Sequence, residues 1–267
     1  MRMPTGFLGI PTLLTMLASA AQAGVVLEYT TRELPSGRTQ SVERYYAQDG
    51  MMRIESVDAA TGAVDHVHLV RDGVIYDIEP RRHTYQRIDP QTMKSVMGAQ
   101  NERMQAMLAQ LPPERRAMMQ ERLARLQSGE EAGPSVSYID TGRSDHAASY
   151  ACRLWTEQRA GHPTAEICVT SFSSVPGGAE FGTSMKNAFD TARGISASVP
   201  QAARAAQDIA RFGKMNGVPV RTRHLATNGD AERETDLSAS RTQSLSADQF
   251  AVPAGYTEKA FGRAASD

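Results

Sequence analysis

The pattern of apolar and polar positions over residues 25–88 predicts a series of β-strands. Side chains alternate with a period of two at 25–32, and the alternation returns at 52–55. Turn signals such as Asp72-Gly73 recur at short intervals, as expected for consecutive hairpins in which glycine supplies positive φ. The segment therefore indicates a meander of about six strands with one face exposed to water and one face covered.

The spacing changes to a helical period after this meander and predicts a helical hairpin over 90–127. Asp89 is a good N-cap, and Pro90 suits the first helical position. Pro112-Pro113 ends the first helix and starts the second. The apolar side chains of this hairpin are our candidate ligand or partner surface: Met93, Met97, Met104, Met107, Leu108, Met119 and Leu123.

This Met-rich hairpin has three interpretations. Core packing against the sheet is the first, because an apolar helical stripe usually faces a core. Flexible methionine side chains could instead form an adaptable lid or a partner-docking surface. In the third interpretation, the hairpin binds to an anionic lipid surface, since residues 90–127 carry six basic and three acidic residues. We expect the hairpin to cover the sheet.

Two cysteines, Cys152 and Cys168, lie in a further predicted hairpin. Residues 150–157 and 165–170 have strand character, and the turn is expected at 159–163. A hairpin centred on Ala160 would place the two cysteines directly opposite each other, within reach of a disulfide. The C-x-x-C spacing typical of redox-active pairs is absent. We therefore predict a structural disulfide.

The complete pattern favours a mainly β fold. A second helical insertion is expected at 185–213, and the final strands flank Asn228-Gly229, a strong hairpin turn. About eleven strands in one antiparallel series then form a curved, half-open barrel, with helical insertions covering its concave face.

The N-terminus has the pattern of a secretory signal peptide over residues 1–23. Arg2 precedes an apolar stretch at 7–18, which is too short to span a bilayer, and the segment ends in a small-residue cleavage signal, Ala21-Gln22-Ala23. No cysteine lies near that site, so lipid attachment is not expected. We expect residues 24–267 to form a single β-rich domain in the periplasm, although an extracellular destination remains open. No later stretch of the sequence reaches membrane-spanning length.

Composition and motifs narrow the functional classes. A formal net charge of -1 provides no basic field for nucleic acid. The sequence contains no nucleophile elbow and no phosphate-binding glycine loop. His66 and His68 share one face of a strand, but no third metal ligand is evident nearby, so a solvated polar face is the favoured interpretation. We expect no enzyme activity, no metal and no cofactor.

Several stretches resemble a family of exported bacterial proteins, the domain of unknown function 4412. They are VIYDIEPRRHTYQRID at 74–89, PPERRAMM at 112–119, CRLW at 152–155, CVTS at 168–171 and LSADQFAVPAGY at 245–256. The resemblance implies a fold similar to that of the periplasmic lipoprotein carriers, a half-open antiparallel barrel that encloses helices. Those carriers use their cavity for acyl chains. The hairpin of this chain is longer and richer in methionine than theirs, so no binding residue is transferred.

Two functional hypotheses follow. The first is a non-enzymatic periplasmic module that binds or carries a lipid-like or other apolar ligand, and it requires a cavity of several hundred Å³ lined by apolar side chains. The second is an envelope module that docks a protein partner through the Met-rich hairpin, and it requires an exposed apolar patch there.

Overall fold

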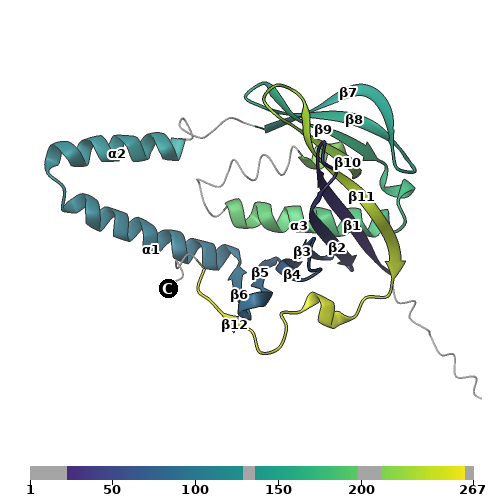
Figure 1. Ribbon diagram of the computed structural model, residues 1–267. Coiled ribbons are helices and arrows are strands. Elements are labelled where there is room, and N and C mark those ends of the chain that lie inside the picture. The colour runs from purple at the N-terminus through teal and green to yellow at the C-terminus, as the bar shows by residue number, and fades with distance from the viewer. Residues whose placement is uncertain (1–22, 129–135, 198–211, 262–267) are drawn as a thin grey trace, which may run out of the picture.

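The structure is a computed structural model that describes residues 23–128, 136–197 and 212–261. Over these ranges the strands form one open sheet of 12 strands, in the order β12-β6-β5-β4-β3-β2-β1-β11-β10-β9-β8-β7 (Figure 1). The strands are β1 Gly24–Glu33, β2 Thr39–Gln48, β3 Met51–Asp58, β4 Val64–Arg71, β5 Val74–Glu79, β6 Thr84–Ile88, β7 Val136–Ala147, β8 Tyr150–Arg159, β9 His162–Thr170, β10 Val218–Leu225, β11 Ala231–Gln243 and β12 Thr257–Glu258.

The predicted fold class is confirmed, with one difference at the edge of the sheet. Strands β1 to β6 are the expected meander of six, and every neighbouring pair except one is antiparallel. The exception is the two-residue strand β12, which pairs in parallel with β6. This strand raises the number to twelve, and it was missed because two residues carry no periodicity.

Helix α3, Gly178–Ala197, covers the inner face of the sheet, where it contacts β1 to β5 (Figure 1). It begins seven residues before the expected position 185, in a stretch whose glycines and serines obscure the helical pattern. Phe181 has a side chain that is only 2% exposed and belongs to the core cluster that includes Leu27 and Met52. A Cβ on Gly178 would lie 2.1 Å from the carbonyl oxygen of Phe172. The first turn of α3 can therefore approach the Phe172 backbone this closely only with glycine at 178.

Helices α1, Pro90–Ala109, and α2, Pro113–Ser128, project from the body as an arm (Figure 1). The Asp89 side chain caps α1 as expected and accepts a hydrogen bond from the Thr92 amide at 2.7 Å. At the other end, the Arg116 guanidinium donates to the carbonyl oxygens of Leu108, Ala109 and Leu111 at 3.0–3.1 Å. Arg116 thereby satisfies carbonyls at the end of α1 and in the turn that follows, and so links the two helices.

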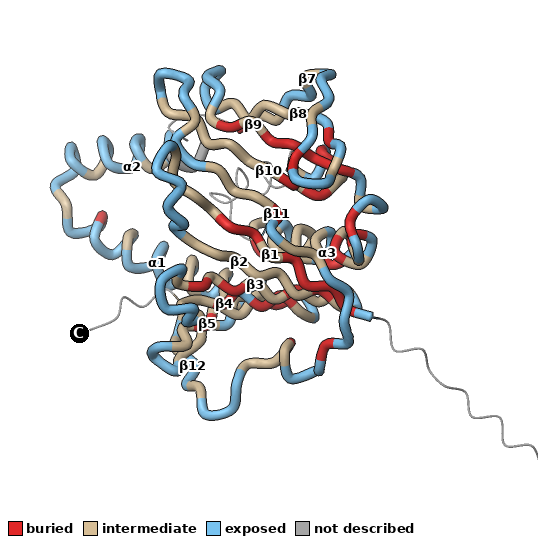
Figure 2. Tube along the Cα trace, turned by 45° about the vertical axis from the view of Figure 1, so that its right-hand side comes forward, coloured by how far each residue is buried: buried red, intermediate tan, exposed pale blue. Residues whose placement is uncertain are grey.

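The expectation that this hairpin covers the sheet is corrected by the structure. Apart from α2, helix α1 contacts mainly β6 and α3, and most of the described residues of α2 are exposed (Figure 2). Met107 and Met118 are 66% and 65% exposed. Helix α3 lies against the sheet instead: its Phe181 packs among buried strand residues, whereas Leu108 is the only buried residue of α1.

The outer face of the first six strands is covered by the C-terminal segment. Leu245 and Phe250 pack with Val26, Leu69 and Ile78 in a second core cluster. The 3-10 helix Ala247–Phe250 starts with a capping box formed by the side chains at 246 and 249. The strand residues at 25 and 26 are therefore both buried, on opposite faces of β1.

The structure joins Cys152 and Cys168 in a disulfide but corrects the expected register. The turn is the two-residue Ala160-Gly161, with both φ angles positive, and a register shift follows after Glu157. As a result, Cys168 lies opposite Leu154 rather than opposite Cys152. The bridge runs diagonally between the strands, over a Cα–Cα distance of 5.4 Å.

Some expectations lie outside the described residues. They include the signal-peptide segment except Ala23, and most of the apolar stripe expected at 200–212. Over the part of the chain that is described, helices long and apolar enough to cross a membrane are absent.

Candidate ligand-binding cavity

A cavity of about 570 Å³ lies between the inner face of the sheet and α3. Strand residues form its floor, and α3 with the residues just before β10 form the opposite wall. The lining residues are Tyr29, Glu43, Tyr45, Glu157, Ile167, Phe172, Phe181, Gly182, Met185, Lys186, Phe189, Phe212, Gly213, Asn216, Gly217, Pro219, Thr222, His224 and Thr235.

A chain of edge-to-face aromatic rings forms one wall of the cavity. The ring centroids of Tyr29 and Tyr45 are 5.3 Å apart, and those of Tyr45 and Phe181 are 6.0 Å apart. Both separations and the steep interplanar angles of 73° and 78° are those of favourable T-shaped pairs. Because Tyr29 and Phe181 are buried, this wall is rigid and apolar.

A second aromatic group joins Phe189 of α3, Phe212 and Tyr138 of β7. Phe212 packs edge-to-face against Phe189 at 5.9 Å and against Tyr138 at 5.5 Å. The chain then passes close to β9 at Gly217, where a Cβ would lie 2.3 Å from the carbonyl oxygen of Thr170. Glycine at 217 therefore allows this wall to approach the sheet closely.

Polar groups in the lining are few and mostly paired. The Tyr45 hydroxyl donates to Glu43 Oε2 at 2.8 Å. Burial raises the pKa of Tyr45, and the negative charge of Glu43 raises it further, so the phenol remains a proton donor at neutral pH. Glu157 accepts a hydrogen bond from Thr164 at 2.7 Å, and Lys186 pairs with Asp190 at 2.7 Å.

His224 adds a titratable group to the lining. Burial lowers the pKa of this imidazole, and the positive charge of Arg233 lowers it further, against Glu157 and Glu232, which raise it. His224 is therefore neutral at physiological pH. The cavity as a whole combines aromatic and aliphatic walls with a small number of hydrogen-bonding groups, which is the usual composition of a small-molecule site.

The seven hairpin residues proposed from the sequence do not line this cavity. Met107 and Met119 are exposed on the arm, Leu108 is buried, and Met93, Met97, Met104 and Leu123 are partly buried. Sequence reasoning missed the α3 residues that do line it. Phe181, Met185 and Phe189 are spaced by four residues, which is a helical signal that the surrounding glycines and serines obscured.

The structure also brings Asp77 to the two histidines of β4. Asp77 lies directly opposite His68 on β5, and its Oδ1 atom is 2.5 Å from His66 Nε2. The two-residue turn at Asp72-Gly73 sets this register, so counting outward from that turn could have paired 68 with 77. Burial lowers the pKa of His68, as does the adjacent His66, while the charges of Asp77 and Glu43 oppose the shift.

Comparison with known proteins places the chain in no established family. No family model and no curated protein match it, so the resemblance to the domain of unknown function 4412 is not confirmed. Among solved structures, it is similar to an uncharacterised conserved protein from Thermus thermophilus, with 8% identity, a TM-score of 0.42, and coverage of 88% of this chain and 89% of that one.

Two further similarities are to MucB in its complex with MucA from Pseudomonas aeruginosa and to a LolA superfamily protein from Nitrosomonas europaea. The first has 10% identity and a TM-score of 0.34, and covers 86% of this chain and 56% of that one. The second has 9% identity and a TM-score of 0.24, and the similarity covers 86% of this chain and 89% of that one. These identities and TM-scores are too low to transfer a function to this chain.

Proposed function

We propose that this protein is an exported, non-enzymatic binding or carrier module for a lipid-like or other apolar ligand, and that the ligand occupies the cavity between α3 and the sheet. The cavity itself is the observation that carries the proposal. Its volume of about 570 Å³ falls within the range of roughly 300–1,000 Å³ typical of small-molecule sites. Its walls are rich in aromatic rings, which offer apolar area at little cost in side-chain entropy.

The polar groups of the lining suggest the form of the ligand. Glu43, Glu157 and His224 come from the sheet, and Lys186 comes from α3. The remaining wall side chains are largely apolar, so most of the ligand surface would be buried without hydrogen bonds. An amphiphile fits such a lining, because its apolar body would contact the apolar walls and its polar end would contact the few polar side chains.

Export is supported by two features of the chain. The N-terminal segment has the charge and length pattern of a signal peptide. The disulfide between Cys152 and Cys168 is expected to persist only where the compartment is oxidising. A periplasmic module is the location that we propose.

The test starts with protein produced in a bacterial periplasm and purified gently. Native mass spectrometry should find an adduct of reproducible mass that is released on unfolding and is extractable into organic solvent. In parallel, the fluorescent fatty acid dansyl-undecanoic acid serves as a defined apolar probe, with its emission reporting transfer into a dry site. We expect saturable binding of one probe molecule per chain.

A variant that fills the cavity makes the test specific. Thr222→Trp places an indole in the lining and should abolish both the adduct and probe binding. Thr156→Trp is the matched control, because Thr156 is also partly buried but points away from the cavity. Its neighbour Trp155 is paired with the lining residue Ile167, and successive residues of a strand point to opposite faces. Equal probe binding by the two variants, both shown to be folded by circular dichroism, would refute the cavity as the site.

The alternative function, docking of an envelope protein through the Met-rich hairpin, stays a prediction. The observation in its favour is the exposure of Met107, Met118 and Met119 on the arm. Methionine-rich helical surfaces adapt to different partners because the side chain is flexible.

A further inference from the structure

Two adjacent strands of the inner face carry a cluster of three potential metal ligands. His66 and His68 lie on β4, and Asp77 lies opposite His68 on β5. One ligand atom of each residue lies within 4.8 Å of the other two. The imidazole rings are 4.4 Å apart between centroids and steeply inclined, at 70°. The three side chains thus form one compact cluster on the inner face.

The distances are compatible with a first coordination shell. Bonds of about 2.0–2.2 Å in a tetrahedral zinc site place neighbouring ligand atoms about 3.3 Å apart. Asp77 Oδ1 is 2.5 Å from His66 Nε2 and 4.0 Å from His68 Nδ1, so the two separations bracket that value.

The Asp77 Oδ1 atom faces both histidines. It is shielded from solvent, and it lies 2.5 Å from His66 Nε2 and 4.0 Å from His68 Nδ1. A shielded carboxylate oxygen requires a nearby positive charge or a donor to offset its desolvation. A bound cation held by the same three side chains would supply that charge.

We propose that His66, His68 and Asp77 form a binding site for a divalent transition-metal ion of the Zn²⁺ class. Two imidazoles and one carboxylate are a ligand set that suits Zn²⁺, and three protein ligands leave one position for water or an anionic oxygen. The His66 and His68 side chains are 32% and 48% exposed, so an ion can reach the site from solvent. This site is separate from the cavity, whose lining includes none of the three residues.

The experiment measures Zn²⁺ binding by isothermal titration calorimetry on mature protein that has been stripped with a chelator and carries no histidine tag. We expect one ion per chain. His68→Ala and Asp77→Asn should each weaken binding by at least about 100-fold, since loss of a supporting outer-shell group alone typically costs 10–100-fold. His162→Ala is the control, because His162 is exposed at the turn between β8 and β9.

A second measurement separates coordination from surface adsorption. Co²⁺ added in place of Zn²⁺ should produce visible absorption bands with the wild type and the control, and none with Asp77→Asn. Circular dichroism and the mass of the oxidised chain would establish that each variant is folded. Failure of the wild type to bind Zn²⁺, or binding that Asp77→Asn and His68→Ala leave unchanged, would overturn the proposal and leave the cluster as a His–Asp ion pair.

Discussion

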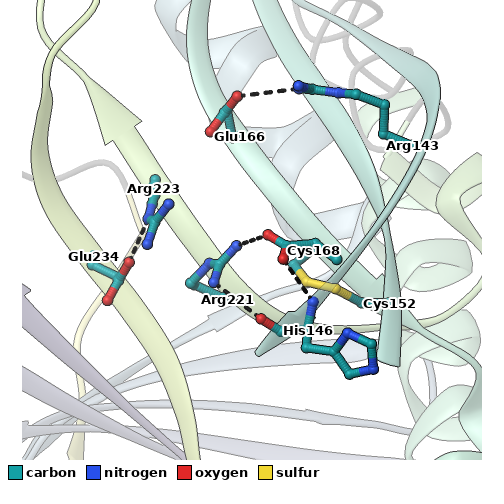
Figure 3. Close-up of polar contacts among 9 residues, drawn as sticks. Arg143, His146, Cys152, Glu166, Cys168, Arg221, Arg223 and Glu234 are labelled. Atoms are coloured by element: carbon teal, nitrogen blue, oxygen red, sulfur yellow. Dashed lines mark hydrogen bonds and ion pairs between the residues drawn. A yellow bond between two sulfur atoms is a disulfide. The ribbon is translucent and has the colours of Figure 1, made fainter. Parts of the chain in front are cut away.

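Arg221 Nη2 lies 2.5 Å from Asp145 Oδ2, and this ion pair joins β10 to β7 across the two strands between them (Figure 3). Those two strands carry the disulfide. In the sheet register, Asp145 is paired with Cys152, and Cys168 is paired with Arg221. The disulfide connects these two cross-strand pairs diagonally, so the covalent bridge and the ion pair together tie β10, β9, β8 and β7 to one another.

Removal of the disulfide should destabilise the protein without unfolding it. The bridge spans a sequence separation of 16 residues. Closing a loop of that size contributes roughly 3 kcal/mol in the chain-entropy model, so Cys152→Ala combined with Cys168→Ala should lower Tm by roughly 6–12 °C. Thermal unfolding followed by circular dichroism measures the shift. Wild-type protein with reductant should match the double variant, and equal Tm values with and without reductant would contradict a structural role.

The Asp145–Arg221 pair should make stability depend on acid pH. The hydrogen bond from the His146 amide and the Arg221 guanidinium hold the pKa of Asp145 below its usual value. A lowered folded-state pKa contributes stability above the unfolded value of about 3.9, and this contribution is lost as pH falls through the folded value. Asp145→Asn should therefore reduce the urea midpoint at pH 6 more than at pH 3. A difference of the same size at both pH values would contradict the assignment.

His224 predicts a separate pH dependence in the weakly acidic range. Burial lowers the pKa of His224 in the folded protein, so the unfolded chain binds a proton more readily below about pH 6.5. Stability should fall as pH drops through 6.5 and level off below the folded pKa of this residue. His224→Gln should remove that part of the slope in urea midpoints taken between pH 7.5 and 5. An unchanged slope would show that His224 is not the responsible group.

Deletion of residues 91–127 separates the two functional hypotheses. The arm contacts the body mainly through α1 against β6 and α3, so the sheet and the cavity should remain folded with only a small fall in Tm. Dansyl-undecanoic acid should still bind if the cavity is the site. Loss of probe binding from a folded deletion variant would instead assign the ligand to the Met-rich hairpin, and a partner captured only by the full chain would support docking.

Local patterns in the sequence were sufficient for most of the secondary structure. Alternation and Asp-Gly turns define β1 to β6, because each hairpin is specified by residues within a few positions of one another. Asp89, Pro90 and the Pro112-Pro113 pair define the helical arm for the same reason. The cysteines could be recognised as a bridging pair, but their register could not, since the shift after Glu157 is not encoded by a turn signal.

By itself, the sequence therefore determined the β-rich class, the strand series and the disulfide partners. Only the tertiary structure decided which helix covers the inner face and where the cavity lies. It also decided that the Asp77 carboxylate lies beside the two histidines. The physical reason is that these features depend on packing between segments distant along the chain. Phe181 is buried against Tyr45 of β2, and no local period in the sequence indicates that contact, whereas the apolar side chains of Met107 and Met118 on the arm are exposed.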